Sequence, residues 1–569
     1  MAKAFNLELR KGFFPYLFYN HANEHYVGAI PALEYFCPDT RKPTKQELKD
    51  YCLSDVSILR QACLKLREAF LTETGIDPFV NATTIASACS AVYRLNDLPP
   101  QTIGIVPIGG YRRKANQSVI AIKWMEWVQQ TTAGVTIEHA GNHDGERQIG
   151  PYFVDGLDEA NKTIYEFNRC IYHGKFLIPK YRLAKVKVVP PRGLYHPVLP
   201  LRKGKLFFTL CAKCPTEQQG ECTHSNEQRS WIGTYVTAEL ELAVSKGYTI
   251  SEIYEVLHYP STMKWDGADS STGLFTSYVL RFLKAKAEAS GFPNWAQTDA
   301  DKELFVQQFE EAEHVRLDMA LIEKNSARRE QSKLCLNTLW GKFAQRPNLP
   351  TRKFFSDVSA FQDLVFDDTN EVTDFKIMNE DVVLVTYRKR KEFIEQNPLT
   401  NVVIAAFTTA WARIRLYSVL DKLGDRALYY DTDSAIFYEK KDEPILEFGL
   451  YLGEFKNEID SNHDMVEFVS AGSKTYAYKL VHGVTGEVSY QVKAKGITLT
   501  HEASQVVNFN SIKEMVLDYN NHTTLTVPTV NFLRSSDYKI KTKPSQKSFA
   551  TTFDKRVLQN DFSSLPFGY

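Results

Sequence analysis

The hexapeptide Tyr-Tyr-Asp-Thr-Asp-Ser at residues 429–434 is the stretch that decides the fold. Its two carboxylates, Asp431 and Asp433, stand one residue apart between short apolar runs at 427–428 and 435–437. An apolar strand interrupted by Asp-Thr-Asp predicts a β-hairpin with an acidic tip. Side chains two residues apart on an extended segment point the same way, so we expect both carboxylates to face one site and to bind a hard cation such as Mg²⁺. The alternative is an ordinary acidic turn, because Asp and Thr are common turn residues.

A long helix-prone stretch precedes the hairpin. It runs from about Thr298 to Phe343, between Pro293 and Pro347, and we expect it to form two helices. In its second half, four residues lie on one helix face at positions i, i+4, i+8 and i+11. They are Arg329, Lys333, Asn337 and Trp340, and Gly341 follows directly. Two cations one turn apart repel each other, so this face suits an anion such as a triphosphate between them. A solvated basic face on a packed helix is the alternative.

A cluster of metal-ligand residue types lies near the middle of the chain. Cys211-Ala-Lys-Cys214 is followed seven residues later by Cys222-Thr-His224. Four closely paired Cys and His ligands are typical of a tetrahedral structural Zn²⁺ site, which leaves no coordination position open for water. The alternative is a cysteine-rich loop whose members point apart.

The composition describes a large protein without a charge bias. With 68 basic and 68 acidic residues in 569, any grip on nucleic acid must be local. Basic runs at 180–205, 388–391 and 539–547 are candidates, although solvated loops explain them equally well. We expect an intracellular protein, in nucleus or cytoplasm, with no membrane partner, because no apolar run reaches the roughly 18 residues of a membrane span and the start lacks a signal-peptide core. Nine cysteines, an odd number, argue for thiols or metal ligands rather than a disulfide scaffold.

The N-terminal third carries a weaker signal, that of a nuclease. Apolar spacing from Thr44 to Leu71 predicts a helix with Tyr51 and Asp55 on one face. Such a pair can orient a metal-bound water in a nuclease, although a surface pair is more common. The stretch 102–161 alternates short apolar strands with Gly and Asn turns. A loose resemblance to a metal-dependent endonuclease centre rests on Asp155, Glu166 and His173.

Three motifs, in order along the chain, resemble those of family B DNA polymerases. Residues 333–342, KLCLNTLWGK, resemble the fingers motif Lys-x-x-x-Asn-Ser-x-Tyr-Gly. Residues 430–434 resemble the palm metal motif, and Lys474-Thr-Tyr476 resembles the Lys-x-Tyr motif that touches the primer strand. Stretches at 11–15, 51–56, 190–197, 211–224 and 554–557 are similar to those of the protein-primed branch, in particular the polymerases of Maverick/Polinton transposons and their viral relatives. The resemblance covers nearly the whole chain.

The resemblance implies an α+β right-hand polymerase with an N-terminal ribonuclease H-like exonuclease remnant. The expected parts are the remnant at 1–95, an insert at 96–180, palm with the zinc clip at 181–273, fingers at 274–345, palm with the acidic hairpin at 346–500, and thumb at 501–569. The expected partners are primer-template DNA, deoxynucleoside triphosphates and a terminal protein primer.

The family chemistry comes with residue roles. A primer 3′-hydroxyl attacks the α-phosphate of a nucleotide with the help of two divalent ions, Mg²⁺ or Mn²⁺. The resemblance implies that Asp433 is the main metal ligand and Asp431 a neighbouring carboxylate. It also implies that the residues that contact the nucleotide are Arg329, Lys333, Asn337, Trp340 and Gly341. Those that contact DNA would be Lys474, Tyr476 and Lys495. Tyr51 and Asp55 resemble what remains of an exonuclease motif, and we expect the two earlier exonuclease motifs to be missing.

Two departures from the family pattern bear on activity. A further catalytic aspartate, in the motif Asp-x-x-Ser-Leu-Tyr-Pro, has no match between His173 and Lys333, since Asp266 and Asp269 lack the Leu-Tyr-Pro that should follow. An internal segment is expected to be missing after Gly174. Loss of such a catalytic group costs several kcal/mol of transition-state stabilisation, so we expect little or no primer extension. The remaining hypothesis is a non-catalytic nucleic-acid-binding protein built from the zinc clip and the basic runs.

Overall fold

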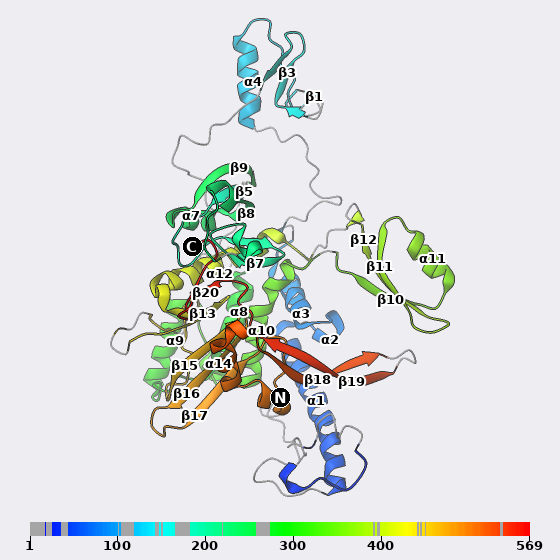
Figure 1. The fold of residues 1–569 in the computed structure, drawn as a ribbon, viewed down its shortest axis with the longest axis vertical. Helices are drawn as coiled ribbons and strands as arrows, with labels where there is room; N and C mark the ends of the chain where they lie inside the picture. The colour runs from blue at the N-terminus through cyan, green and yellow to red at the C-terminus, as the bar shows by residue number, and fades with distance from the viewer. Residues whose placement is uncertain are drawn as a thin grey trace. The chain divides into compact units, whose positions relative to one another are not determined.

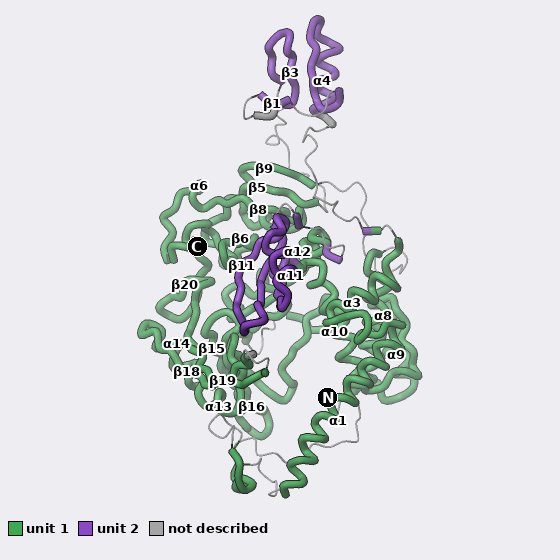
Figure 2. Tube along the Cα trace, turned by 90° about the vertical axis from the view of Figure 1, so that its right-hand side faces the viewer, with its two compact units in different colours: residues 1–102, 180–345, 401–569 green, residues 103–179, 346–400 purple. Residues whose placement is uncertain are grey.

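The computed structural model of the chain describes residues 18, 26–35, 44–100, 102–103, 119–142, 147–149, 152–165, 182–218, 220–257, 273–346, 348–390, 393–394, 399–440, 443, 446–449, 451–534 and 539–569. The chain divides into two compact units (Figure 2). Unit 1 comprises residues 1–102, 180–345 and 401–569, and unit 2 comprises residues 103–179 and 346–400. Helices and strands are mixed along the chain, which confirms the α+β class, and the ladders between the described strands are antiparallel. The finer domain boundaries stay a prediction.

The N-terminal helices begin and end where their caps dictate. The first long helix, α1 (Lys45–Thr74), starts with a capping box between Thr44 and Glu47 and stops at Gly75, whose φ is 71°. This confirms the helix predicted from Thr44 to Leu71. Around it lie η2 (Leu33–Tyr35), α2 (Pro78–Asn81), α3 (Ile85–Val92) and the π-helical turn η3 (Tyr93–Asp97).

A three-stranded sheet of order β8-β5-β9 holds one core of unit 1 (Figure 1). Its strands are β5 (Leu183–Val189), β8 (Trp231–Val236) and β9 (Thr249–Leu257). Buried residues of β5 and β8 share an apolar cluster with residues of α7 (Thr237–Ser245) and α12 (Val402–Leu423), so both helices cover this sheet. The Cys/His segment lies among β6 (Pro200–Lys203), β7 (Lys205–Phe208), α5 (Cys214–Glu217) and α6 (Asn226–Arg229).

Three helices form the part expected to be fingers. These are α8 (Thr276–Glu288), α9 (Asp299–Glu313) and α10 (Ser326–Phe343), with the turn η5 (Met319–Leu321). A capping box at Thr298 starts α9, and the Asn325 side chain caps α10. The prediction of two helices between Thr298 and Phe343 is confirmed.

The C-terminal third of unit 1 is mostly β structure. The turn η7 (Gly424–Arg426) leads into the hairpin β13 (Ala427–Asp431) and β14 (Ser434–Phe437). A sheet of order β15-β16-β17 follows, built from β15 (His463–Gly472), β16 (Thr475–His482) and β17 (Val488–Lys493). Then come α13 (His501–Val506), α14 (Phe509–Leu517), η8 (Tyr519–Asn521), β18 (Thr524–Arg534), β19 (Ile540–Ala550), β20 (Val557–Leu558) and β21 (Ser564–Leu565).

Unit 2 contains two small α/β groups. The first holds α4 (Val119–Thr131), β1 (Arg147–Ile149), β2 (Tyr152–Val154), β3 (Gly156–Asp158) and β4 (Thr163–Tyr165). The second holds β10 (Thr351–Phe355), α11 (Val358–Phe366), β11 (Asn370–Ile377) and β12 (Val383–Lys389). The alternation of short strands predicted for 102–161 is wrong at α4, where Ala121 and Met125 recur at helical spacing and are buried against Ile137.

The expectation that no stretch could span a membrane is wrong for Val402–Arg426, which comprises α12 and η7: it is long and apolar enough to do so, with a mean hydropathy of 1.2 and 22% of the apolar window buried. Its polar side chains are engaged inside unit 1. Arg413 Nε lies 2.5 Å from Oε1 of the buried Glu239, and the Tyr417 hydroxyl donates to the His196 carbonyl at 3.0 Å. These contacts tie α12 to other elements of unit 1.

Candidate active site and metal centre

The acidic hairpin predicted from the sequence is confirmed. β13 and β14 pair with Asp431 opposite Ser434, and Thr432 at the tip has a φ of 57°. The Asp433 amide donates to the Asp431 carbonyl at 2.7 Å, which closes the turn. The geometric reason predicted for the pair is wrong, because Asp433 lies in the turn and not on an extended segment. The turn nevertheless holds both carboxylates at one end of the hairpin.

The primer-strand motif reaches this acidic tip. Lys474 occupies the turn between β15 and β16, and its Nζ lies 2.8 Å from Oδ2 of Asp431. Its amide donates to the Tyr429 hydroxyl at 3.0 Å. The hydrogen bond to the Asp431 carboxylate raises the pKa of Lys474. Two motifs that are far apart in the sequence therefore meet at one point.

Aromatic side chains support this junction. The Tyr476 ring lies 4.9 Å from that of Tyr429 and 5.9 Å from that of Phe468, between centroids. Lys495 is exposed, and its amide donates to the Thr475 hydroxyl at 3.3 Å, so it borders the same strand. All three predicted DNA-contact residues, Lys474, Tyr476 and Lys495, thus lie on or next to β16.

The predicted nucleotide face lies on α10. Lys333, Asn337 and Gly341 are exposed, and a Cβ added to Gly341 would meet no atom within 4 Å. Arg329 pairs with Glu330 at 2.9 Å. Trp340 is half-buried, its ring 4.8 Å from that of Phe275 and its Nε1 donating to the Leu336 carbonyl at 2.8 Å. The indole is therefore engaged by its own protein on at least one side.

The sequence reasoning missed a lysine on a neighbouring helix. Burial lowers the pKa of Lys286 on α8, and three nearby cations lower it further: Arg329, Lys333 and Lys456. Glu313 opposes this lowering, and Arg329 is paired with Glu330. The four cations still outnumber these two carboxylates, so the group suits a phosphate-bearing ligand. The spacing on α10 gave no hint of Lys286, because the residue comes from another helix.

The helix α12 links this cationic group to the acidic tip. The amide of Asn401, its N-cap residue, donates to the Phe343 carbonyl at the end of α10 at 3.0 Å. At its other end, α12 packs against η7 and β14. The helix α12 therefore contacts both parts of the expected nucleotide site within unit 1, the end of α10 and the acidic hairpin.

A third carboxylate does not join Asp431 and Asp433 in the part of the chain that the structure describes. There, the one group of at least three potential metal ligands is the Cys/His cluster. Asp266 and Asp269 lie outside the described residues, as do Gly174 and the 11–15 stretch. The expectation that the hairpin has lost a partner therefore stays a prediction.

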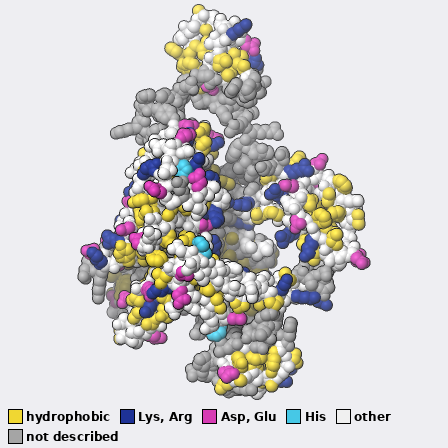
Figure 3. Space-filling model, viewed as in Figure 1, with side chains coloured by type: hydrophobic (Ala, Val, Ile, Leu, Met, Phe, Trp, Pro, Cys, Tyr) yellow, Lys and Arg dark blue, Asp and Glu magenta, His cyan; other side chains and the backbone are white. Residues whose placement is uncertain are grey.

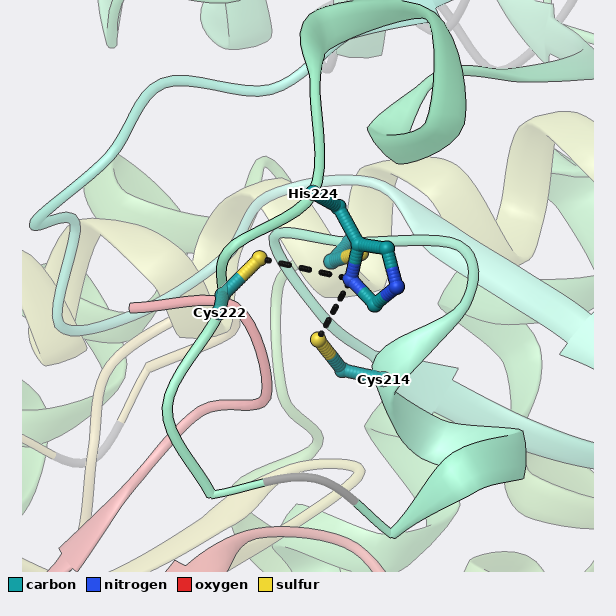
Figure 4. Close-up of side chains that lie close together, drawn as sticks. Cys214, Cys222 and His224 are labelled. Atoms are coloured by element: carbon teal, nitrogen blue, oxygen red, sulfur yellow. Dashed lines mark hydrogen bonds between the residues drawn. The ribbon is translucent and has the colours of Figure 1, made fainter.

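The Cys/His cluster has converged as predicted. One ligand atom from each of Cys211, Cys214, Cys222 and His224 lies within 4.8 Å of the others. Figure 4 shows the sulfurs of Cys214 and Cys222 pointing at His224 Nδ1, at 3.4 and 3.8 Å, and Cys211 Sγ lies 3.5 Å away. Tetrahedral bonds of about 2.3 Å to sulfur and 2.0–2.1 Å to nitrogen place these atoms about 3.6 Å apart. The alternative of ligands pointing apart is wrong.

A fifth residue, which the sequence reasoning missed, orients the histidine. Glu217 Oε2 lies 3.0 Å from His224 Nε2, the nitrogen that faces away from the sulfurs. A carboxylate on the outer nitrogen fixes which nitrogen faces the metal. Burial raises the pKa of Cys222, but hydrogen bonds with His224, Cys214 and Cys211 together lower it to about 7. Burial raises the pKa of Cys214.

Of the nuclease candidates, the structure describes Tyr51, Asp55 and Asp155. Tyr51 and Asp55 lie one turn apart on α1, with the Tyr51 side chain buried. Asp155 follows β2, whereas Glu166 and His173 lie outside the described residues. Basic and acidic side chains are mixed over the face shown in Figure 3, as the zero net charge leads one to expect.

Comparison with known proteins finds similarity to DNA polymerases. Residues 314–424 match the family described as DNA polymerase type B, organellar and viral. A DNA polymerase of Kluyveromyces lactis is 21% identical over 449 residues, which cover 77% of this chain and 38% of that protein. The chain thus spans little more than a third of that relative. The matched segment contains α10 and α12 and ends before the acidic hairpin.

Two solved structures are also similar. Phi29 DNA polymerase complexed with primer-template DNA gives a TM-score of 0.48 at 15% identity, covering 96% of this chain and 77% of that one. The same polymerase complexed with single-stranded DNA gives 0.47 at 16% identity, covering 97% and 77%. The family match over residues 314–424 agrees with the predicted resemblance to family B DNA polymerases.

Proposed function

We propose that the chain is a DNA-directed DNA polymerase of right-hand architecture that adds deoxynucleotides to a primer 3′-hydroxyl. The observation that carries the proposal is the contact between Lys474 and Asp431, 2.8 Å from Nζ to Oδ2. It joins a primer-strand motif to a metal motif at one tip, which is where a primer end has to meet a nucleotide. In this reading α8 to α10 are fingers, the hairpin belongs to the palm, and the region after about His501 is thumb.

The residues divide the work by charge. Asp433 and Asp431 hold Mg²⁺ or Mn²⁺, which would stabilise the attacking and leaving oxygens. Lys333, Arg329 and Lys286 neutralise the triphosphate, while Asn337, Trp340 and Gly341 line the base-pair pocket. Lys474 and Tyr476 hold the primer end, and Lys495 holds the duplex by a phosphate contact that carries no sequence information.

The missing aspartate motif limits the rate. Two divalent ions surrounded by too few carboxylates lose part of the negative charge that stabilises them, and removal of one such group costs roughly 3–4 kcal/mol. We infer that DNA and nucleotide binding survive better than extension. The protein-primed mode, the transposon-like origin and the exonuclease remnant at Tyr51 and Asp55 rest on the resemblance of sequence stretches alone, as does an intracellular location.

The Cys/His cluster holds Zn²⁺ in a structural role. Its support is the match between the sulfur–nitrogen distances of 3.4 to 3.8 Å and a tetrahedral site, together with the Glu217 carboxylate behind His224. With four protein ligands, no position is left for a substrate or a reactive water.

Primer extension with Mg²⁺ and with Mn²⁺ tests the proposal. We expect slow, template-directed addition that Asp433→Ala abolishes and that Glu443→Ala, a change at an exposed carboxylate after the hairpin, does not. Addition that survives Asp433→Ala would contradict the assigned metal ligand. Degradation of single-stranded DNA that is lost in Asp55→Ala would instead support the nuclease hypothesis.

A further inference from the structure

The last segment of the described structure, residues 551–569, runs between three parts of unit 1. It is called the C-terminal tail below. It carries the short pair β20 and β21 and is drawn in the reddest part of the colour ramp in Figure 1. The polymerase assignment counts this segment with the thumb and gives none of its residues a role.

One end of the tail lies on the Cys/His cluster. Phe567 is 2% exposed and packs with Cys211 and Cys214, and its carbonyl accepts from the Leu210 amide at 2.7 Å. A Cβ added to Gly568 would lie 2.6 Å from the Cys211 Cβ, so only glycine allows this approach. The backbone at Leu210 and Cys211, the first of the four potential metal ligands, therefore also binds the end of the tail.

The other end of the tail lies beside the Lys474 turn. The Thr552 amide donates to the Ala471 carbonyl at 2.9 Å. A Cβ added to Gly472 would lie 2.1 Å from the Thr552 carbonyl oxygen, again an approach that needs glycine. Gly472 is two residues from Lys474, the lysine paired with Asp431.

Between these ends, Arg556 stands behind the acidic hairpin. Its guanidinium lies 5.0 Å from the centre of the Tyr195 ring, and Nη1 donates to the Tyr195 carbonyl at 3.3 Å. Tyr195 contacts His196, and His196 contacts Tyr430, with ring centres 4.8 and 5.6 Å apart. Tyr430 directly precedes Asp431. The Arg556 charge also opposes the rise in the pKa of Tyr430 that burial causes.

We propose that the C-terminal tail is a strap, held by the metal-loaded Cys/His cluster, that positions the acidic hairpin through Arg556. Arg556 is thus a positioning residue and touches no reacting group. Metal binding orders the Cys211 loop, the ordered loop seats Phe567 and Gly568, and the seated tail keeps Arg556 against Tyr195. The proposal concerns the hairpin's order and rests on the proposed function only for its effect on DNA synthesis.

Hydrogen exchange on the full chain tests the strap. Zn²⁺ is removed with a thiol reagent and a chelator, and exchange is followed in peptides covering 552–569, 427–437 and, as an internal control, 278–283 of α8. We expect faster exchange in the tail and in the hairpin, with the α8 peptide unchanged. A tail or a hairpin that keeps its exchange rate without metal would overturn the proposal.

A matched pair of variants separates positioning from general loosening. Arg556→Met removes the contact with Tyr195 and also the bonds that Nε and Nη2 donate to the Ser564 hydroxyl and carbonyl within the tail, at 2.9 and 2.8 Å. The 552–569 peptide is therefore followed beside 427–437. Lys555→Met removes a neighbouring cation whose contacts are the Leu206 carbonyl and the Phe207 ring. Arg556→Met should speed exchange at 427–437 roughly ten- to hundredfold, the usual effect of losing charged hydrogen bonds, and should keep its zinc. Lys555→Met should leave that peptide at the wild-type rate.

If the 427–437 peptide exchanges at the same rate in the two variants, Arg556 does not position the hairpin. Because exchange needs neither DNA nor nucleotide, a chain that synthesises no DNA still answers this question. Conversely, the chain could synthesise DNA while Arg556→Met leaves the exchange rate at 427–437 unchanged. That result would support the proposed function and contradict the strap.

Discussion

Acidification should lower the free energy of unfolding through one histidine, His196, whose ring contacts Tyr430 of the acidic hairpin. His196 is 5% exposed, and its Nε2 donates to the Gly424 carbonyl at 2.8 Å. Its Nδ1 is buried and has no hydrogen-bond partner among the described residues. Protonation would place a second N–H there with nothing to accept it. Burial, against the opposing effect of the Gly424 bond, therefore lowers the pKa of His196 to about 4.

The size of the effect follows from the difference between the folded and unfolded pKa. The unfolded value is about 6.5, and each pKa unit is worth about 1.4 kcal/mol, so the 2.5-unit difference amounts to about 3 kcal/mol. Because the unfolded chain takes up the proton first, the free energy of unfolding falls as the pH drops from about 6.5 to about 4. Above pH 6.5 both states are neutral at His196, and the effect vanishes.

Urea unfolding of the wild type and of His196→Gln between pH 7 and pH 4 measures this effect. Glutamine retains a donor for Gly424 and does not titrate, so the difference between the two proteins isolates His196. We expect the wild type to lose up to about 3 kcal/mol more than the variant over this range. A difference that stays constant with pH, or a histidine-selective NMR titration that places His196 near 6.5, would refute the reasoning.

Three further substitutions test the site. Lys474→Met should leave thermal stability nearly unchanged, because an exposed ion pair is worth about 0–1 kcal/mol, yet slow primer extension about tenfold or more; equal losses of both would contradict a primer role. Gly341→Ala should stabilise α10 by roughly 0.5–1 kcal/mol and raise the KM for nucleotide, and an unchanged KM would remove Gly341 from the base-pair pocket. Glu217→Gln should weaken zinc binding about 10–100-fold in a competition titration, whereas Glu221→Gln should not.

Local chemistry explains what the sequence could predict. The hairpin was predictable because Asp-Thr-Asp between apolar runs leaves few alternatives to a turn. The helix α1 was predictable from its apolar spacing, and α9 and α10 from a helix-prone stretch between two prolines; the structure adds that Thr44, Thr298 and Asn325 cap them. The metal cluster was predictable because its ligands are close in sequence, so a short loop suffices to bring them together.

Tertiary packing decides the rest. Lys286 joins the cations of α10 from α8, and Glu217 was hidden because a single glutamate near cysteines carries no pattern. The buried face of α10 includes Gln331 and Ser332, so it lacks the apolar stripe that marks a core helix. The turn that holds Asp431 and Asp433 at one end of the hairpin has a positive φ at Thr432, which a strand pattern cannot reveal.

The most direct test of the central claim, one nucleotide site shared by α10 and the acidic hairpin, is binding rather than synthesis. The measurement is the affinity of the full chain for primer-template DNA with a dideoxy-terminated primer and Mg²⁺, with the complementary or a mismatched deoxynucleoside triphosphate present. We expect the complementary nucleotide to tighten DNA binding, and Lys333→Met and Asp433→Ala each to abolish this gain while Lys324→Met retains it. Equal affinity with both nucleotides, or a gain that survives both substitutions, would contradict the account.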